Sequence, residues 1–147
     1  MTGTLDAFAP DVGAELPELR PSRISRATLA LFAGASGDTN PIHIDLDVAR
    51  SAGFEDVFAH GMLSMAYLGR LLTSSLPGAR LRAWRVRFRA VTPVHAAPVC
   101  RAVVAGVDDG VATLDLEVRL PDGTITLSGT ATVDVTGLVA GTRKDLP

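Results

Sequence analysis

The sequence has a single cysteine, a single lysine and few aromatic residues, and it contains no long apolar run. Cys100 cannot form an internal disulfide or a cysteine-based zinc site, and a lone cysteine is typical of a reducing compartment. No stretch approaches the ~18 consecutive apolar residues of a membrane-spanning helix, and the first residues lack the basic start of a secretory signal. We therefore expect a cytoplasmic protein without a membrane partner.

Charged residues are scarce as well. They make up 20% of the chain, and the formal net charge is −2, so no overall basic field exists to attract nucleic acid.

The histidines at positions 43, 60 and 95 lack the spacing of the common zinc-binding motifs. We expect neither a nucleic-acid partner nor a bound metal. We also expect His95 to lie on the surface and Cys100 to be a buried apolar residue in a strand.

The length fits one domain. A chain of 147 residues, 47% of them hydrophobic, can bury a core without a disulfide or a structural metal. We expect a single domain over residues 1–147, with flexible ends at about residues 1–10 and 139–147. The charged fraction is below that of an average soluble domain, which leaves apolar surface for an interface.

The first half of the chain predicts short helices and an ordered loop. Ser25 is placed to cap a helix over residues 26–32, because its hydroxyl can accept hydrogen bonds from the first free amides. Gly34 and Gly37 are expected to end that helix. Residues 37–44 contain Asp, Asn and Pro together, which is typical of a loop and not of a continuing helix.

Two further helices are expected. Asp45 or Asp47 can cap a short one, which should stop at Gly53. The longest helix is predicted over residues 61–76, where Arg70 is the only charged residue. A helix that is apolar nearly all round is expected to be buried.

The second half predicts antiparallel strands. Residues alternate over 81–91, so that one set faces the core and the other faces away: the core set is Trp84, Val86 and Phe88, and the other is Arg85, Arg87 and Arg89. Three further strands, over residues 98–107, 110–120 and 123–135, form a meander joined at Asp109-Gly110 and Asp122-Gly123, dipeptides that favour tight hairpins. Helices followed by strands predict an α+β fold in which the sheet packs against the buried helix.

The segment from Ser36 to His43 carries the residues best suited to acid–base chemistry. Asp38 and His43 stand five positions apart in a predicted loop, where a turn lets both side chains reach one water molecule. Imidazole can take and return a proton near neutral pH, while the carboxylate can orient the water. Asn40 can tie the loop to its backbone, and Pro41 restricts it. In isolation, Asp38 and Asn40 would be simple turn formers and His43 a packed histidine.

A second cluster, over residues 58–63, stands where the longest helix begins. The first amides of a helix are unpaired and carry partial positive charge, so the N–H groups of Gly61 and Met62 can hold a thioester oxygen as it becomes an enolate. Glycine also lets a ligand approach the backbone closely. By itself this pattern would be an ordinary helix start, with His60 capping or packing.

Together the two clusters resemble a known family. The segments SGDTNPIH (36–43), FAHGML (58–63) and VRFRAVTPV (86–94), with Phe32 and Ala49 around the first, are similar to the (R)-specific enoyl-thioester hydratases of the MaoC-like dehydratase family. The resemblance runs over about residues 29–94. It implies a single hotdog fold, in which an antiparallel sheet wraps around a long central apolar helix.

The resemblance also implies an activity. Asp38 and His43 would form the catalytic pair, the Gly61 N–H would polarise the thioester carbonyl, and Asn40 would hold the loop. The implied reaction is the reversible addition of water to a trans-2-enoyl thioester of coenzyme A or acyl carrier protein, without a metal or redox cofactor. The alternatives are a hotdog acyl-thioesterase and a non-catalytic partner subunit. A homodimer is expected, with a heterodimer of related hotdog subunits as the alternative.

Two features add to this reading. Gly69 stands where some members of the family have a serine, which removes a serine contact and implies an enlarged acyl pocket. Five arginines fall within residues 80–89 and can meet the phosphates of coenzyme A or an acidic carrier protein, although a solvated strand face is the simpler reading of each. Substrate-binding or loop-supporting roles are therefore expected for Asn40, Pro41, His60, Met62, Arg85, Arg87 and Arg89.

Overall fold

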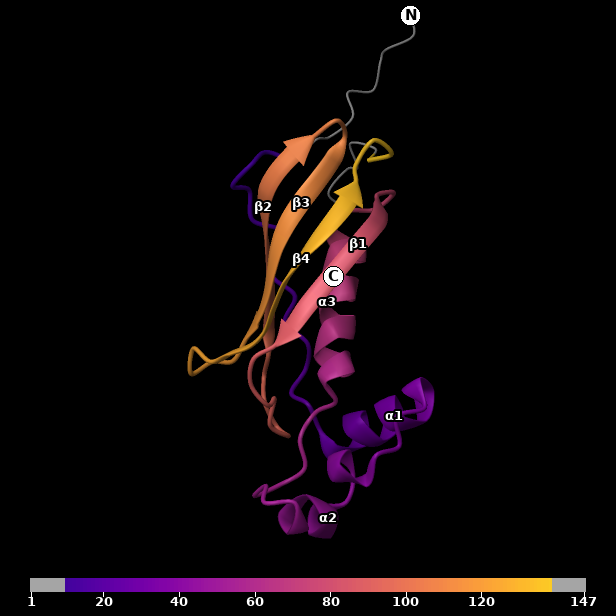
Figure 1. Ribbon diagram of the computed structural model, residues 1–147, viewed down its shortest axis with the longest axis vertical. Coiled ribbons are helices and arrows are strands. Elements are labelled where there is room, and N and C mark those ends of the chain that lie inside the picture. Colours follow the sequence, from indigo (N-terminus) through magenta and orange to yellow (C-terminus); the bar gives the residue numbers. More distant parts are fainter. Residues whose placement is uncertain (1–9, 139–147) are drawn as a thin grey trace, which may run out of the picture.

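A long helix lies against a four-stranded antiparallel sheet, and the short helices gather near its start (Figure 1). The computed structural model describes residues 10–138, so the ends predicted to be flexible, residue 10 apart, lie outside the described residues. No helix within residues 10–138 is long and apolar enough to cross a membrane. In chain order the elements are α1 (Arg26–Ser36), the 3-10 helix η1 (Pro41–His43), α2 (Leu46–Ser51), α3 (Gly61–Ser75), β1 (Arg80–Phe88), β2 (Val99–Asp108), β3 (Val111–Arg119) and β4 (Ile125–Asp134).

The first helix is capped as predicted but is longer than predicted. The Ser25 hydroxyl accepts a hydrogen bond from the Thr28 N–H at 3.0 Å. The helix continues through Gly34 to Ser36, so the expected end near residue 32 is wrong. It stops where Gly37 takes a φ of 77°, a left-handed conformation that glycine adopts without steric cost.

Asp45, and not Asp47, caps α2. Its carboxylate accepts hydrogen bonds from the N–H groups of Asp47 and Val48 at 2.9 and 3.3 Å. The helix ends at Ser51, two residues before the predicted stop at Gly53. Gly53 supplies the left-handed turn that follows the helix, with a φ of 91°.

The strand order of the sheet is β1-β4-β3-β2. The predicted meander of β2, β3 and β4 is confirmed, while β1 pairs with β4 at the far side of the meander. Asp109 and Gly110 form the expected two-residue turn, with φ values of 44° and 71°. The second hairpin has a longer loop, because the Leu120 N–H donates to the Thr124 carbonyl at 2.8 Å across three residues.

The inner face of the sheet packs against one face of α3, which confirms the α+β arrangement. The cluster contains Leu68, Leu71 and Leu72 of the helix, and from the strands Cys100, Ala102, Val104, Leu114, Leu116, Val118, Leu127 and Ala131. Burial raises the pKa of the Cys100 thiol to about 12, as its predicted core position requires. His95 is exposed, as predicted. The helix is not buried all round, however, because the sheet covers only one face and Met62 and Ala66 lie exposed on another.

Two aromatic side chains of strand β1 pack against two glycines of α3. A Cβ at Gly61 would lie 2.7 Å from Cε1 of Phe88, and a Cβ at Gly69 would lie 2.8 Å from Cη2 of Trp84. Eight helical residues rise about 12 Å and four strand residues span about 13 Å, so the two contacts are in register. Both glycines are therefore needed for the close approach of β1 to α3.

The predicted core face of β1 is correct at two of its three positions. Trp84 and Val86 are half-buried and pack against the main cluster. Phe88 is 53% exposed, so its assignment to the core is wrong. Phe88 is the last residue of β1, and its ring lies against Gly61 in the first turn of α3.

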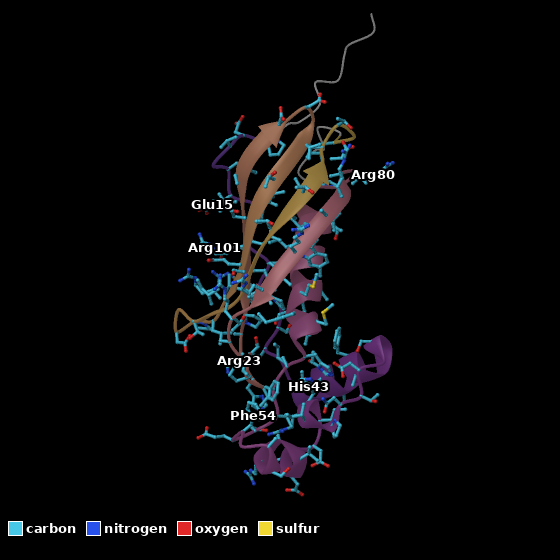
Figure 2. The ribbon with its side chains drawn as sticks, viewed as in Figure 1. Glu15, Arg23, His43, Phe54, Arg80 and Arg101 are labelled. Atoms are coloured by element: carbon cyan, nitrogen blue, oxygen red, sulfur yellow. The ribbon has the colours of Figure 1, made fainter. Side chains whose placement is uncertain are left out.

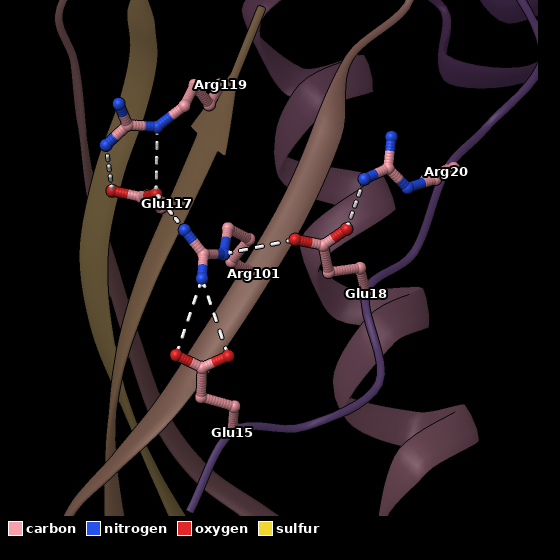
Figure 3. A network of polar contacts seen from close by, with 6 residues as sticks. All are labelled: Glu15, Glu18, Arg20, Arg101, Glu117 and Arg119. Carbon is pink, nitrogen blue, oxygen red and sulfur yellow. Dashed lines mark hydrogen bonds and ion pairs between the residues drawn. The ribbon is translucent and has the colours of Figure 1, made fainter. Parts of the chain in front are cut away.

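The segment before α1 runs along β2 and is held there by backbone hydrogen bonds, beside which ionic contacts join the two (Figure 3). Arg101 of β2 lies 3.4 Å from Glu15, 3.3 Å from Glu18 and 3.8 Å from Glu117 of β3. These side chains are partly or largely exposed, so each pair adds little to stability. The segment covers the β2 edge of the sheet, whereas no strand within residues 10–138 covers the β1 edge.

Candidate active site

The loop between α1 and α2 is held by its own side chains. The Asp38 carboxylate accepts a hydrogen bond from the Asn40 N–H at 3.3 Å. The Asn40 side chain in turn accepts one from the Ile42 N–H at 3.1 Å and so caps η1. Pro41 is the first residue of η1, a position where the missing N–H costs nothing. These contacts fix the direction in which Asp38 and His43 leave the backbone.

His43 lies close to the start of α3, away from the sheet (Figure 2). Its Nδ1 atom is 2.8 Å from the carbonyl oxygen of Phe58. A carbonyl oxygen only accepts hydrogen bonds, so Nδ1 carries the proton and Nε2 holds the lone pair of the neutral ring. Within residues 10–138 nothing bonds to Nε2, which leaves this atom available as a base.

His60 connects the loop to the start of α3. The side chain is 1% exposed, and its Nε2 donates to the backbone carbonyl of Asp38 at 3.0 Å. Burial lowers the pKa of His60, with the nearby His43 acting in the same direction, so the neutral ring is favoured. The ring centroids of the two histidines are 4.0 Å apart. His60 thus supports the backbone that carries Asp38 and packs against the ring of His43.

These contacts bring Asp38, His43 and His60 together. One oxygen or nitrogen atom from each side chain lies within 4.8 Å of the others. A carboxylate and an imidazole at this separation suit proton transfer through one water molecule. The same atoms are of the types that bind divalent cations, but each histidine already uses one nitrogen on a backbone carbonyl. The expected absence of a metal stays a prediction.

The start of α3 lies beside these three residues. The helix begins at Gly61, directly after His60, and no described side chain caps it by a hydrogen bond. The first N–H groups of a helix have no partner within the helix, so those of Gly61 and Met62 are available to a ligand oxygen. Gly61 also leaves room for the ring of Phe88. The Met62 side chain is 54% exposed and lies next to Asp38 in a shared cavity.

Two cavities border the first turns of α3. The Asp38 cavity has a volume of about 380 Å³ and is lined mainly by apolar side chains; its lining is Phe32, Ser36, Asp38, Met62, Met65, Ala66 and Trp84. The Arg89 cavity has a volume of about 340 Å³ and lies between α3, the end of β1 and β4; Phe58, Gly61, Ser64, Phe88, Arg89, Thr92 and Thr126 are among its lining residues. Of the nominated residues, Asp38 and Met62 line the apolar cavity, Gly61 and Arg89 line the partly basic one, and His43 lines neither.

Only one of the three nominated arginines borders either cavity. Arg89 lines the Arg89 cavity, and its Nε donates to the Ser128 hydroxyl at 2.9 Å. Arg85 and Arg87 are exposed on β1 and line neither cavity. Arg82 instead pairs with Asp134 of β4 at 2.7 Å. Of these three arginines, Arg89 alone is placed to meet a ligand in one of the two cavities.

The expected enlargement of the pocket at Gly69 is wrong. The ring of Trp84 occupies the space beside the glycine and would clash with any side chain there. Trp84 also lines the Asp38 cavity. The space gained by the absence of a serine is therefore filled by an indole ring.

Three site residues were not identified from the sequence as such. The sequence shows Phe58 only as part of its motif, and the role of its carbonyl in orienting His43 depends on a contact between segments 15 positions apart. Trp84 was assigned to the core, although it also lines the Asp38 cavity. Ser64 lies in the segment that predicts an apolar helix, and its spacing of three residues from Gly61 is the signal in the sequence that could identify it.

The chain is similar in sequence to known proteins. The sequence model described as MaoC like domain matches residues 8–122. The (R)-specific enoyl-CoA hydratase of Rhodospirillum rubrum is 46% identical over 55 residues, which cover 37% of this chain and only 38% of that protein. The 3-hydroxyacyl-thioester dehydratase Z of Mycobacterium tuberculosis is 31% identical over 120 residues, covering 78% of this chain and 73% of that protein.

A solved structure extends the similarity to the whole fold. The (R)-hydratase from A. caviae involved in PHA biosynthesis superposes with a TM-score of 0.81 at 28% identity, covering 88% of this chain and 99% of that one. This match, together with the helix packed against an antiparallel sheet, confirms the predicted single hotdog fold. The match of the sequence model over most of the chain leads to the same assignment. The chain belongs to the MaoC-like domain family.

Proposed function

We propose that this protein is an (R)-specific enoyl-thioester hydratase, which adds water reversibly to a trans-2-enoyl thioester. The observation that carries the proposal is the approach of Asp38, His43 and His60 within 4.8 Å, beside the uncapped start of α3. The names of the relatives support it, because they are a hydratase and a dehydratase acting on thioesters. The (R) configuration of the product is taken from the first of these names.

In the proposed reaction, Asp38 and His43 hold one water molecule between them. His43 Nε2 takes a proton from the water while the water oxygen bonds to C3 of the enoyl group. The electrons of the double bond move toward the thioester oxygen, and the Gly61 N–H stabilises the negative charge that forms there. The proton then returns to C2, which gives the 3-hydroxyacyl thioester and restores the neutral imidazole.

The two cavities suggest how the substrate lies. The Asp38 cavity is mainly apolar and suits the acyl chain, whereas Arg89 offers a charged contact for a phosphate of the carrier. Acyl groups on coenzyme A and on acyl carrier protein both present such phosphates. We therefore propose that the carrier enters past Arg89 and that the acyl chain extends along α3 toward Trp84.

Crotonyl-coenzyme A tests this function against the thioesterase alternative. The purified chain should cause a reversible loss of enoyl absorbance, without release of free thiol. Chiral analysis of the product should give the (R)-3-hydroxyacyl thioester. Thiol release with no reversible loss of the double bond would identify a thioesterase instead.

Two further arms of the same assay address the remaining alternatives. A catalytic chain should be active when purified alone, whereas a non-catalytic partner subunit would show no turnover until a related subunit is added. Chelation with EDTA should leave the rate unchanged, because no step of the proposed chemistry uses a metal ion. A rate that falls with EDTA and returns with added zinc would contradict the absence of a metal cofactor.

We further propose that two copies associate through β1 and the exposed side of α3. Within residues 10–138 the β1 edge is unpaired, and exposed apolar side chains of Leu81, Phe88 and Met62 lie on these two elements. Association would give the edge strand a partner and cover apolar surface. Sedimentation of the purified chain should give the mass of a homodimer; a monomer that assembles only with a related subunit would favour the heterodimer. A cytoplasmic location stays a prediction.

A further inference from the structure

We infer that Ser64 is a catalytic residue whose hydroxyl donates a second hydrogen bond to the thioester oxygen, beside the Gly61 N–H. The inference rests on the proposed hydratase function. It starts from a polar group in α3 that the structure leaves without a partner.

Ser64 is 2% exposed, and within residues 10–138 its hydroxyl forms no hydrogen bond. Buried hydroxyl groups nearly always have a partner, because leaving one unpaired is unfavourable. Ser74 on the same helix shows the usual solution, since its hydroxyl donates to the Arg70 carbonyl at 2.6 Å. Ser64 therefore differs from an ordinary helical serine, and we expect a bound ligand to supply its hydrogen-bond partner.

The position of Ser64 in the helix indicates what that partner is. Ser64 stands three residues after Gly61, so both lie on the same side of α3, and helical side chains lean toward the helix N-terminus. Both residues line the Arg89 cavity. A ligand oxygen in that cavity near the first turn would meet the Ser64 hydroxyl, the Gly61 amide and the positive end of the helix dipole together.

An oxygen that only accepts hydrogen bonds and gains negative charge during the reaction fits this environment. The thioester carbonyl meets both conditions, because the electrons of the C2–C3 double bond shift onto its oxygen as water adds at C3. Ser64 keeps its own proton throughout and donates only a hydrogen bond. The proton taken from water returns to C2, so the Ser64 contact strengthens in the transition state and relaxes in the product.

A structural role for Ser64 makes a different prediction. His60 Nδ1 also lacks a partner within the described residues and lies four residues before Ser64. Because His60 Nε2 carries the proton, Nδ1 is an acceptor, and a rotated Ser64 hydroxyl would bond to it. Removal of such a bond would lower stability, whereas removal of an unpaired buried hydroxyl should leave stability unchanged or raise it.

The Ser64→Ala variant separates these roles. We expect kcat on crotonyl-coenzyme A to fall about 100-fold, the size seen when one donor to an oxyanion is removed, while KM changes little and the melting temperature is unchanged or higher. Ser64→Cys should show a similar loss of rate, because a thiol has nearly the same size but is a weak donor. Ser74→Ala is the matched control and should keep the wild-type rate. A lower melting temperature with kcat within twofold of wild type would assign Ser64 to the structural pair.

Binding measurements test the contact without turnover. Calorimetry should show that Ser64→Ala weakens butyryl-coenzyme A, which has the carbonyl, only slightly, in keeping with the small change in KM, and leaves the affinity for S-butyl-coenzyme A, which lacks the carbonyl, unchanged. Equal weakening of both ligands would overturn the inference. If the wild-type chain does not hydrate crotonyl-coenzyme A at all, the proposed function fails. If it does and the Ser64 variants match its rate, only the role of Ser64 fails.

Discussion

The two ends of α3 are held in opposite ways. At its start, His43 and His60 donate to backbone carbonyls of other segments, and two cavities open beside them. Toward its end, Leu71 and Leu72 are enclosed by the sheet. A few directed hydrogen bonds thus orient the reactive groups, while the sheet fixes the helix on which they depend. Substitutions at the start should mainly change the rate, and those in the enclosed part should mainly change stability.

The largest effect is expected at the start of the helix. His43→Ala and Asp38→Asn should each lower kcat/KM for crotonyl-coenzyme A by about 10²–10⁴-fold, because each removes one side of the acid–base pair. The melting temperature should change little, since Asp38 is exposed and His43 only half-buried. Turnover close to wild type in either variant would contradict the roles assigned to Asp38 and His43. It would also contradict the expectation that the rate depends on residues at the start of α3.

The reverse pattern is expected in the enclosed part. Leu114→Ala removes a fully buried side chain that belongs to the same cluster as Leu71, and it should lower the free energy of unfolding by about 2–5 kcal/mol. Urea unfolding would measure this loss, and kcat of the folded enzyme should stay near wild type. Leu31→Ala is the control, because Leu31 is 75% exposed and its truncation should have little effect.

The two glycines of α3 that contact β1, Gly61 and Gly69, allow the same comparison with one kind of substitution. Gly61→Ala and Gly69→Ala should each lower the free energy of unfolding by about 1–3 kcal/mol, because the added methyl group meets an aromatic ring below 3 Å. Only Gly61→Ala should also reduce kcat, since the displaced turn carries the proposed donor. Combining Gly69→Ala with Trp84→Ala should lose less stability than the sum of the two single changes. Similar effects of the two glycine variants on kcat would contradict the expectation that only substitutions at the start of α3 change the rate.

The smallest effect concerns the dependence of stability on pH. Burial lowers the pKa of His60 below that of an unfolded histidine, so the unfolded chain binds more protons between the two pKa values. Neutral His60 contributes to the free energy of unfolding above about pH 6.5. This contribution is lost as the pH falls from there toward the pKa of His60 in the folded chain. Melting temperatures from pH 8 to 5 should fall less steeply in His60→Gln than in wild type. Identical slopes would show that His60 does not titrate in this range.

Local signals in the sequence predicted much of this structure. Ser25 and the Asp109-Gly110 turn act within a few residues of their own positions and are found as predicted, and Asp45 is one of the two caps predicted for α2. The same holds for Asn40, which caps the turn that follows it. The residues of the candidate site fall in two short segments, but local signals alone would favour a turn and an ordinary helix start there, and only the resemblance to the MaoC-like family points to a site.

Contacts between distant segments could not be predicted in this way. The pairing of β1 with β4 depends on the whole sheet, and the bond from His60 to the Asp38 carbonyl spans 22 positions. The indole of Trp84 beside Gly69 reversed the expected effect of that glycine on the cavity. Such contacts depend on how whole elements pack against one another, and the sequence of a single segment does not determine that packing.

The unequal edges of the sheet limit how far copies of this chain could assemble. Residues of the segment before α1 already lie along β2, and their bridges and ion pairs occupy that edge. A sheet with two open edges can add strands at both and grow into a filament. A sheet that joins only through β1 has no second docking edge once one copy is bound, so growth by edge pairing terminates at a closed pair.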